Sequence, residues 1–152
     1  MVYQTISDKY DFDDSVLVKT MVAIPEKVLN LLGDKDAVKI LVTAGKGGRP
    51  HAIVCGTIIS PAPDMMAVGE VLMHRASKNL DNNAKSSFLV VKGMESYEIN
   101  CCFKERQTAG PLYDAMKAQC DAMKLPLAAV RVFQVCCVCD EGAGPNAGKK
   151  IA

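Results

Sequence analysis

Residues 73–80 carry the side chains of this chain best suited to bind a ligand. Two cations and two neutral polar groups lie within five positions, and they are Arg75, Ser77, Lys78 and Asn79. The apolar run before them predicts that this segment leaves a strand and turns into a short helix. Cations and free backbone N–H groups at a helix start bind phosphate. The alternative is that Ser77 or Asn79 caps the helix and that the cations are simply solvated.

The composition is typical of a soluble globular protein. The 152 residues predict one domain, 49% of the residues are hydrophobic, and 18 basic residues against 17 acidic ones leave a formal charge of +1. No basic stripe with interleaved aromatic residues is present, so we expect no nucleic-acid partner. The first residues do not resemble a signal peptide, and no apolar run is long enough to cross a bilayer. We therefore expect a cytoplasmic protein without a membrane partner.

Seven cysteines are unusual for a chain of this length. They are Cys55, Cys101, Cys102, Cys120, Cys136, Cys137 and Cys139. The last three lie in a predicted strand, where alternation would point Cys136 away from Cys137 and Cys139 and spoil a compact metal site. We therefore predict no metal site and expect the cysteines to pack as small hydrophobic residues. A cysteine-based metal or thiol-redox role is the alternative.

Six predicted strands dominate the chain. They cover residues 37–44, 50–59, 65–69, 86–92, 96–106 and 129–140, with a break at residues 60–64. Short helices are predicted at 25–33 and at 81–83, after the segment 73–80, and a longer one at 111–125. Residues 1–20 are interpreted as an N-terminal arm, and no structure is assigned to the glycine-rich tail, 141–152. This pattern predicts a mainly β fold, an antiparallel sheet closed or nearly closed into a barrel with short flanking helices.

The helix predicted at residues 111–125 has one apolar stripe. Its members recur every three or four positions and are Leu112, Met116, Cys120 and Met123. This spacing predicts a buried helix face. A methionine-rich stripe is more often part of the core than of a cofactor site, so we assign it to packing.

Three segments resemble the FMN-binding split-barrel family, the pyridoxamine 5′-phosphate oxidase-like proteins, and most closely its short flavin-binding members. The first is the strand–turn–strand of residues 41–51, which ends in Gly48-Arg49-Pro50-His51. The second contains Val68-Gly69, Met73-His74-Arg75 and Asn79-Leu80. The third is the strand 97–103 followed by Gly110-Pro111 at a helix start. Together they extend over residues 24–140.

This resemblance implies a single-domain, six-stranded Greek-key split β-barrel that forms a homodimer with FMN at the subunit interface. Arg75 falls at the family's phosphate-binding position. Ala76 and Ser77 would offer backbone N–H or hydroxyl donors, and Lys78 would be a second cation. The other cofactor-binding residues that the resemblance implies in this segment are Val68, Gly69 and His74. Asn79 is either part of the site or a helix cap.

A second implication of the resemblance concerns the flavin ring. The strand residues that would run beside the isoalloxazine are Val54, Cys55, Gly56 and Thr57. Glycine at position 56 would let a flat ring approach the backbone closely, although it could also mark a β-bulge. Cys55 could affect the flavin, but packing is the simpler explanation of this residue.

The chain also departs from pyridoxamine-phosphate oxidases, because its end, Gly-Lys-Lys-Ile-Ala, lacks their substrate-binding Arg and His. We expect an FMN-dependent oxidoreductase, resembling flavin reductases, with a nicotinamide or a protein as electron donor. The alternative is a non-enzymatic FMN carrier or electron-transfer protein. Neither His51 nor His74 has the partners of a nucleophilic site, and no residue is predicted as a general acid or base.

Overall fold

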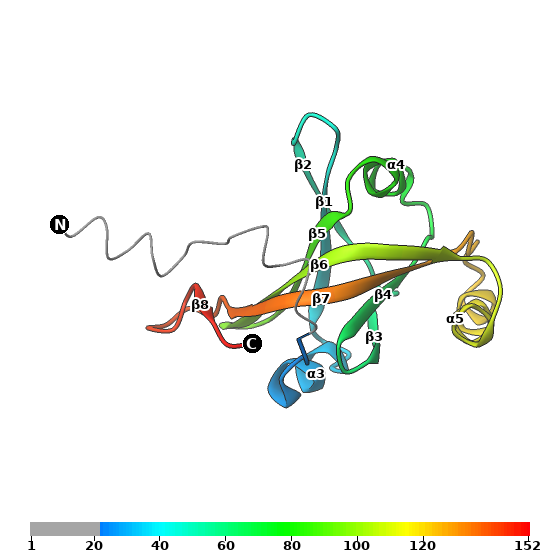
Figure 1. Ribbon diagram of the computed structural model, residues 1–152. Coiled ribbons are helices and arrows are strands. Elements are labelled where there is room, and N and C mark those ends of the chain that lie inside the picture. Colours follow the sequence, from blue (N-terminus) through cyan, green and yellow to red (C-terminus); the bar gives the residue numbers. More distant parts are fainter. Residues whose placement is uncertain (1–21) are drawn as a thin grey trace.

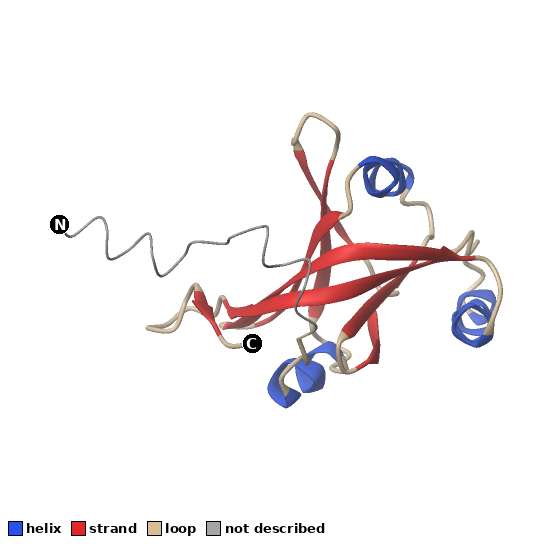
Figure 2. Cartoon of the chain, in the orientation of Figure 1, coloured by secondary structure: helices blue, strands red, loops and turns tan. Residues whose placement is uncertain are grey.

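The computed structural model describes residues 22–152, and the predicted N-terminal arm, residues 1–20, lies outside them. Eight strands and three helices are present in this part of the chain (Figures 1 and 2). The strands are β1 (Val38–Ala44), β2 (Pro50–Val54), β3 (Ile59–Ala62), β4 (Met65–Gly69), β5 (Lys85–Lys92), β6 (Glu95–Gln107), β7 (Val130–Asp140) and β8 (Lys149–Lys150). The helices are α3 (Glu26–Leu32), α4 (His74–Asn82) and α5 (Pro111–Ala122).

One antiparallel sheet contains all eight strands. Its order is β2-β1-β5-β6-β7-β4-β3, and β8 pairs with β7. The two outermost strands, β2 and β3, follow one another in the chain but do not pair in the described part of the protein. The sheet is therefore a barrel left open between β2 and β3, so the predicted mainly β, split-barrel class is confirmed. The split is important because the candidate site lies beside it.

The main core fills the inside of this curved sheet. Phe133 on β7 meets Phe88 on β5 edge to face, with ring centroids 5.0 Å apart, and Phe103 on β6 with centroids 5.7 Å apart. Burial alternates along β5, as expected for a strand with one face in the core. Helix α3 closes the lower end through Val28, which is completely buried (Figure 1).

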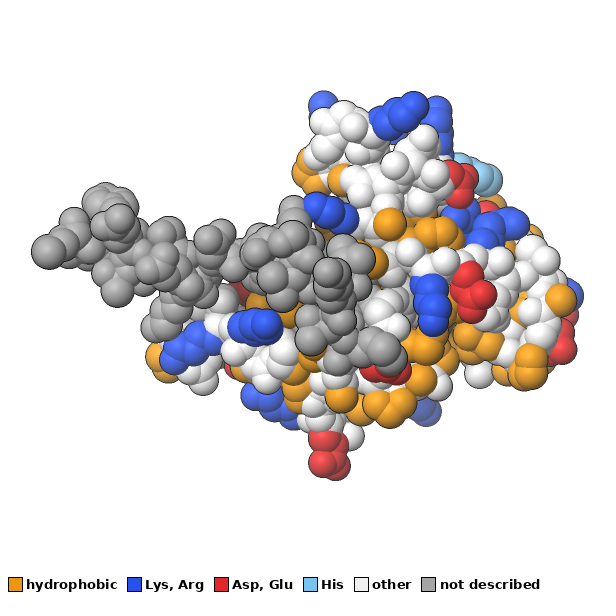
Figure 3. Space-filling view, in the orientation of Figure 1, with side chains coloured by type: hydrophobic (Ala, Val, Ile, Leu, Met, Phe, Trp, Pro, Cys, Tyr) orange, Lys and Arg blue, Asp and Glu red, His pale blue; other side chains and the backbone are white. Residues whose placement is uncertain are grey.

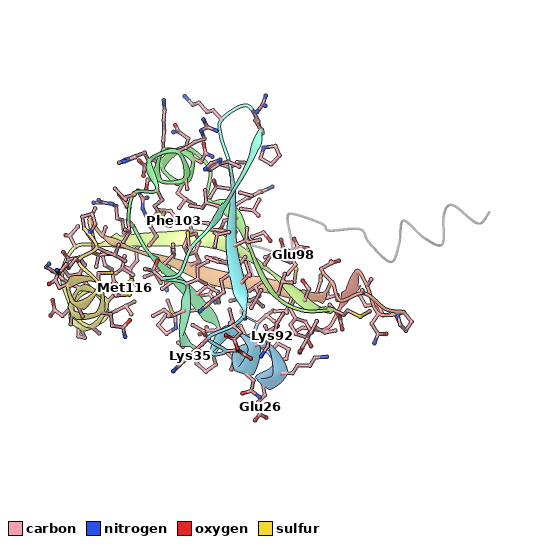
Figure 4. The ribbon with its side chains drawn as sticks, turned by 180° about the vertical axis from the view of Figure 1, so that it is seen from behind. Glu26, Lys35, Lys92, Glu98, Phe103 and Met116 are labelled. Atoms are coloured by element: carbon pink, nitrogen blue, oxygen red, sulfur yellow. The ribbon has the colours of Figure 1, made fainter. Side chains whose placement is uncertain are left out.

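A second, smaller core lies under α5. Met116 and Cys120 pack with Ala67, Val130 and Val132, and Met116 is labelled on α5 in Figure 4. The helix ends at Ala122, before the predicted residue 125. The prediction that Met123 is buried is wrong: Met123 follows the last helical residue, precedes Lys124 with its positive φ of 56°, and is 58% exposed.

The predicted strand 50–59 is in fact two strands, β2 and β3, separated by a turn. Cys55, Gly56 and Thr57 therefore lie in a turn and not in a strand. The physical reason is a change of partner, because β2 pairs with β1 whereas β3 pairs with β4. Apolar residues occur on both sides of the turn, from Ala52 to Cys55 and again at Ile58 and Ile59, which is why the sequence pattern did not reveal it.

Two further differences concern the extent of β3 and an additional strand. Residues 60–64 were predicted as a break, yet β3 includes Pro61, which is tolerated because β3 is an edge strand with a register irregularity. In the glycine-rich tail, β8 pairs with the end of β7 through Cys139 and Asp140. Both strands are short, and neither has a distinctive apolar pattern.

Candidate functional site

A cavity of about 660 Å³ lies beside the split of the barrel. One wall is the end of β2 and the following turn, from His51 and Ile53 to Thr57. The opposite wall runs from Gly69 at the end of β4 through Val71 to Arg75 in α4, and residues after α5 complete it. The volume lies within the range of cavities that bind cofactors and other small molecules.

The polar end of this cavity is the N-terminus of α4. The helix begins at His74, and Met73 at the N-cap position provides no side-chain hydrogen bond to the first-turn N–H groups. Arg75 is exposed in this first turn and lines the cavity. Its guanidinium has no hydrogen bond or ion pair with any residue that the structure describes. Uncapped N–H groups and an unpaired guanidinium together form an anion-binding corner.

Thr57 attaches the turn after β2 to Gly69 at the end of β4. Thr57 Oγ1 accepts a hydrogen bond from Gly69 N and donates one to Gly69 O, both at 3.1 Å. A Cβ at position 69 would lie 2.6 Å from Met116 Sδ and 3.2 Å from Thr57 Cβ. Position 69 therefore needs glycine for close packing, and the turn after β2 is anchored to the end of β4.

The structure brings seven of the predicted site residues to one cavity. These are Val54, Cys55, Gly56, Thr57, Gly69, His74 and Arg75. A Cβ at Gly56 would meet nothing within 4 Å, so the backbone there is open. Burial raises the pKa of Cys55 to about 11, so its thiol is protonated at neutral pH.

The other predicted residues lie elsewhere. Val68 and Ala76 are completely buried, so neither lines the cavity. Ser77 and Lys78 line an adjacent cavity of about 420 Å³, which shares His74 with the first. Ser77 Oγ is buried and has no hydrogen-bond partner in the described part of the chain.

Asn79 has a packing role in this structure. The hypothesis that Ser77 or Asn79 caps the helix is wrong, because α4 already begins at His74 and both residues lie inside it. Asn79 Nδ2 donates to Thr43 Oγ1 at 3.0 Å and so attaches α4 to β1. Its Oδ1 would lie 3.1 Å from a Cβ at Gly45, which leaves no room for a side chain there.

Sequence reasoning missed seven residues of the cavity wall, of which all but the first are apolar. They are His51, Ile53, Val71, Leu72, Met73, Met123 and Leu125. Val54, Leu72 and Met123 are 72%, 70% and 58% exposed, which is unusual for three apolar side chains around one cavity. Leu72 also has a positive φ of 53°, a strained conformation for a leucine. The only sequence signal for the residues after α5 was the third family motif, the strand 97–103 followed by Gly110-Pro111, which leads into that helix.

An ion-pair network supports the loop between β4 and α4. Arg131 on β7 is 2% exposed, and its guanidinium donates to Glu70 Oε2 and to Asp81 Oδ1, both at 2.8 Å. Arg106 donates to both Glu70 oxygens, at 3.0 and 3.3 Å. Glu70 follows Gly69, and Asp81 lies near the end of α4. The network therefore holds both ends of the segment that carries Arg75.

Cations gather around this end of the molecule. Figure 3 shows lysine and arginine side chains over the β1–β2 turn and α4, with a histidine beside them. The exposed cations of these elements are Lys46, Arg49, Arg75 and Lys78. Within residues 22–152, no group of three or more His, Cys, Asp or Glu residues could hold a metal ion. In the same range, no helix has the length and apolar character needed to cross a membrane.

Comparison with known proteins identifies the fold. No protein-family model matches the chain, and no curated protein is similar to it in sequence. Among solved structures, an FMN-binding protein from Syntrophomonas wolfei superposes with a TM-score of 0.67 at 14% identity, covering 95% of this chain and 99% of that one. A member of the pyridoxinephosphate oxidase family from Clostridium acetobutylicum, related to general stress protein 26, has a TM-score of 0.60 at 14% identity, covering 84% and 94%.

A third similar structure is described by a different ligand. HutZ, the haem storage protein from Vibrio cholerae, has a TM-score of 0.54 at 13% identity, covering 75% of this chain and 89% of that one. All three comparisons agree on the architecture. The chain has the split-barrel fold of the FMN-binding, pyridoxamine 5′-phosphate oxidase-like proteins, which confirms the resemblance at the level of fold.

The ion-pair network predicts a pH-dependent stability. Partial burial raises the pKa of Glu70, but hydrogen bonds and charge from Arg106 and Arg131 outweigh it and hold the pKa below its ordinary value of 4.5. The ionised Glu70 therefore stabilises the folded state above pH 4.5, and this contribution is lost as the pH falls through the lowered pKa. We expect Glu70→Gln to reduce the free energy of unfolding by about 1.5–3 kcal/mol at pH 7.

Chemical denaturation of both proteins between pH 3 and pH 7 measures this difference. It should shrink steadily below pH 4.5. Asp121→Asn is the control, since it removes the exposed Lys117–Asp121 pair and should cost only about 0.5 kcal/mol. A Glu70→Gln difference that is the same at pH 3 and pH 7 would contradict the account.

Proposed function

We propose that this protein binds FMN in the cavity beside the split of its barrel. The observation that carries the proposal is that one cavity combines an anion-binding end with apolar walls. Its polar end has the unpaired guanidinium of Arg75 and the uncapped start of α4, whereas its walls are mainly apolar. FMN needs both, because a dianionic phosphate is joined to a large flat ring.

The phosphate end consists of the first turn of α4. Arg75 supplies the charge, and the free N–H groups at the helix start supply directional donors. His74 lies beside them on the cavity wall. Lys78 lines the adjacent cavity, so its contribution is electrostatic attraction at longer range. The phosphate of FMN would thus be held chiefly by Arg75 and by backbone N–H groups.

The ring end consists of the turn after β2. Val54, Cys55 and Gly56 form a surface on which the isoalloxazine can lie, and Gly56 has no side chain to obstruct the ring. The protonated thiol of Cys55 places no negative charge beside the ring. The Thr57–Gly69 hydrogen bonds attach this surface to the end of β4, from which the chain leads to α4. The protein would therefore fix the position of the flavin ring and set the polarity of its surroundings.

When bound, FMN supplies the redox chemistry, so the protein needs no general acid or base of its own. We infer an oxidoreductase related to flavin reductases, with a nicotinamide or a protein as electron donor. A non-enzymatic carrier is the alternative within the same proposal. The rate of FMN reduction by NADH or NADPH separates a nicotinamide-dependent enzyme from a carrier, because a carrier would oxidise neither nucleotide.

The exposed apolar rim suggests what completes the cavity. Val54 and Leu72 are more than two-thirds exposed on either side of the opening, and water would otherwise surround them. A second copy of the chain would cover them and enclose the ring, because a two-fold interface uses the same patch on both subunits. We therefore propose a homodimer with FMN at the subunit interface.

Arg75→Ala should weaken FMN binding by about 1.5–3 kcal/mol, on the scale of one charge-assisted hydrogen bond. Lys78→Ala is the matched control, since it removes the same charge from the same helix outside the main cavity. It should cost less than about 1 kcal/mol. Fluorescence titration with FMN measures both. A loss for Lys78→Ala equal to or larger than that for Arg75→Ala would overturn the phosphate assignment.

Val54→Asp should convert the dimer to a monomer, because a carboxylate would be buried without a partner in the interface. Sedimentation velocity without FMN should show twice the monomer mass for the wild type and one monomer mass for the variant. Met94→Asp is the control, since Met94 is 73% exposed in the β5–β6 turn and lines a different cavity. A wild-type monomer, or a dimeric Val54→Asp, would contradict the proposed interface.

Haem binding is the second candidate, since HutZ shares the fold. The observation that favours it is that both histidines, the half-buried His51 and the exposed His74, line the same cavity. A neutral imidazole is a common axial ligand of haem iron. In this case hemin would give a Soret band that His51→Ala or His74→Ala removes, and excess FMN would displace it. A Soret band that neither variant affects would exclude this site.

A further inference from the structure

A cluster of four cysteines lies on the side of the sheet that faces away from the main core. Its members are Cys102 on β6 and Cys136, Cys137 and Cys139 on β7. Asn100 Nδ2 donates to Cys137 Sγ at 3.6 Å, and Cys139 pairs with Glu98 two residues further along β7. Cys102 lies two residues from Asn100 on β6 and therefore shares its face. Cys136 contacts Cys102 directly, with their sulfur atoms 3.7 Å apart.

A bulge in β7 creates this cluster. The register between β6 and β7 shifts between Asn100, which pairs with Cys137, and Cys101, which pairs with Val135. Cys136 is the extra residue left without a pairing partner on β6, as in a β-bulge. The prediction that Cys136 points away from Cys137 and Cys139 is therefore wrong, because regular alternation stops at this bulge.

We propose that Cys102 and Cys136 form a reversible intramolecular disulfide bond. The Cys136 thiol already donates to Cys102 Sγ, so the two sulfurs face each other across neighbouring strands. A covalent bond requires them to approach to about 2.05 Å. Strands β6 and β7 are paired on both sides of the bulge. The side chains of Cys102 and Cys136 therefore stay close to each other.

An oxidant can reach this pair. Cys102 and Cys136 both line a cavity of about 250 Å³, together with Thr43, Ser87 and Asn100. Cys102 is half-buried, whereas Cys136 is 5% exposed. Cys102 is therefore the thiol that a small reagent reaches first, and Cys136 is placed to react second.

The reaction is a thiol–disulfide exchange with a low-molecular-weight disulfide such as oxidised glutathione. The Cys102 thiolate attacks one sulfur of the reagent, forms a mixed disulfide and releases one thiol. Cys136 then loses its proton and attacks the Cys102 sulfur, which releases the second thiol. The two protein thiols are oxidised, and one reagent disulfide is reduced to two thiols. Burial raises the pKa of Cys136 to about 12, which disfavours the loss of its proton before the second step.

The test is oxidation of the wild-type protein with oxidised glutathione, followed by alkylation and peptide mass spectrometry. We expect the number of free thiols to fall by two, a peptide pair cross-linked through Cys102 and Cys136, and a monomer mass on denaturing gels without reductant. Dithiothreitol should restore all seven thiols. A cross-link between any other pair, an intermolecular cross-link or no loss of thiols would overturn the proposal.

Single serine variants locate the bond independently. Cys102→Ser and Cys136→Ser should each prevent the intramolecular cross-link. Cys120→Ser is the control, since Cys120 is buried in the smaller core under α5, and it should leave the cross-link unchanged. A cross-link that persists in Cys102→Ser would assign the reaction to Cys137 or Cys139 instead.

Discussion

The reciprocal hydrogen bonds between Thr57 and Gly69 are the contact on which the site depends. The sheet remains open between β2 and β3, so no ladder of backbone hydrogen bonds fixes the distance across the split. Thr57 lies between β2 and β3, and its hydroxyl bonds both the N–H and the C=O of Gly69, so it attaches the turn after β2 to the end of β4, in continuation of the β3–β4 pairing. The cavity between the turn after β2 and the start of α4 thus has a defined width, although the barrel is not closed.

The positive charge of the site comes from Arg75 at the start of α4, on the wall opposite the turn after β2. Arg75 has no ion-pair partner among the described residues, whereas Glu70 and Asp81 are bonded to Arg131 and Arg106. Because buried charges are stable only when they are paired, Arg131 requires these partners. The network therefore fixes the loop before α4 and the end of α4 without using the charge of Arg75. A positive corner results in a protein whose formal net charge is only +1.

The sequence was most informative where local chemistry determines structure. Apolar runs located β1, β4 and β7, and residues spaced three or four apart located the buried face of α5. The apolar run that ends at Gly69 predicted that the following segment leaves a strand and turns into a helix. It was least informative where distant contacts decide. The turn at Gly56 exists because β3 changes partner, the bulge at Cys136 because two registers meet, and the role of Asn79 depends on Thr43, 36 residues away. The apolar wall of the cavity comes from three separate parts of the chain, which no local pattern indicates.

Recognition of a phosphate by Arg75 and the start of α4 is the central claim. Titration of the wild-type protein with FMN and, separately, with riboflavin tests it most directly, because the two ligands share the ring and differ in the phosphate. The account predicts that FMN binds at least about tenfold more tightly, a difference of about 1.4 kcal/mol or more. Equal affinities for both flavins, or no binding of either, would contradict it.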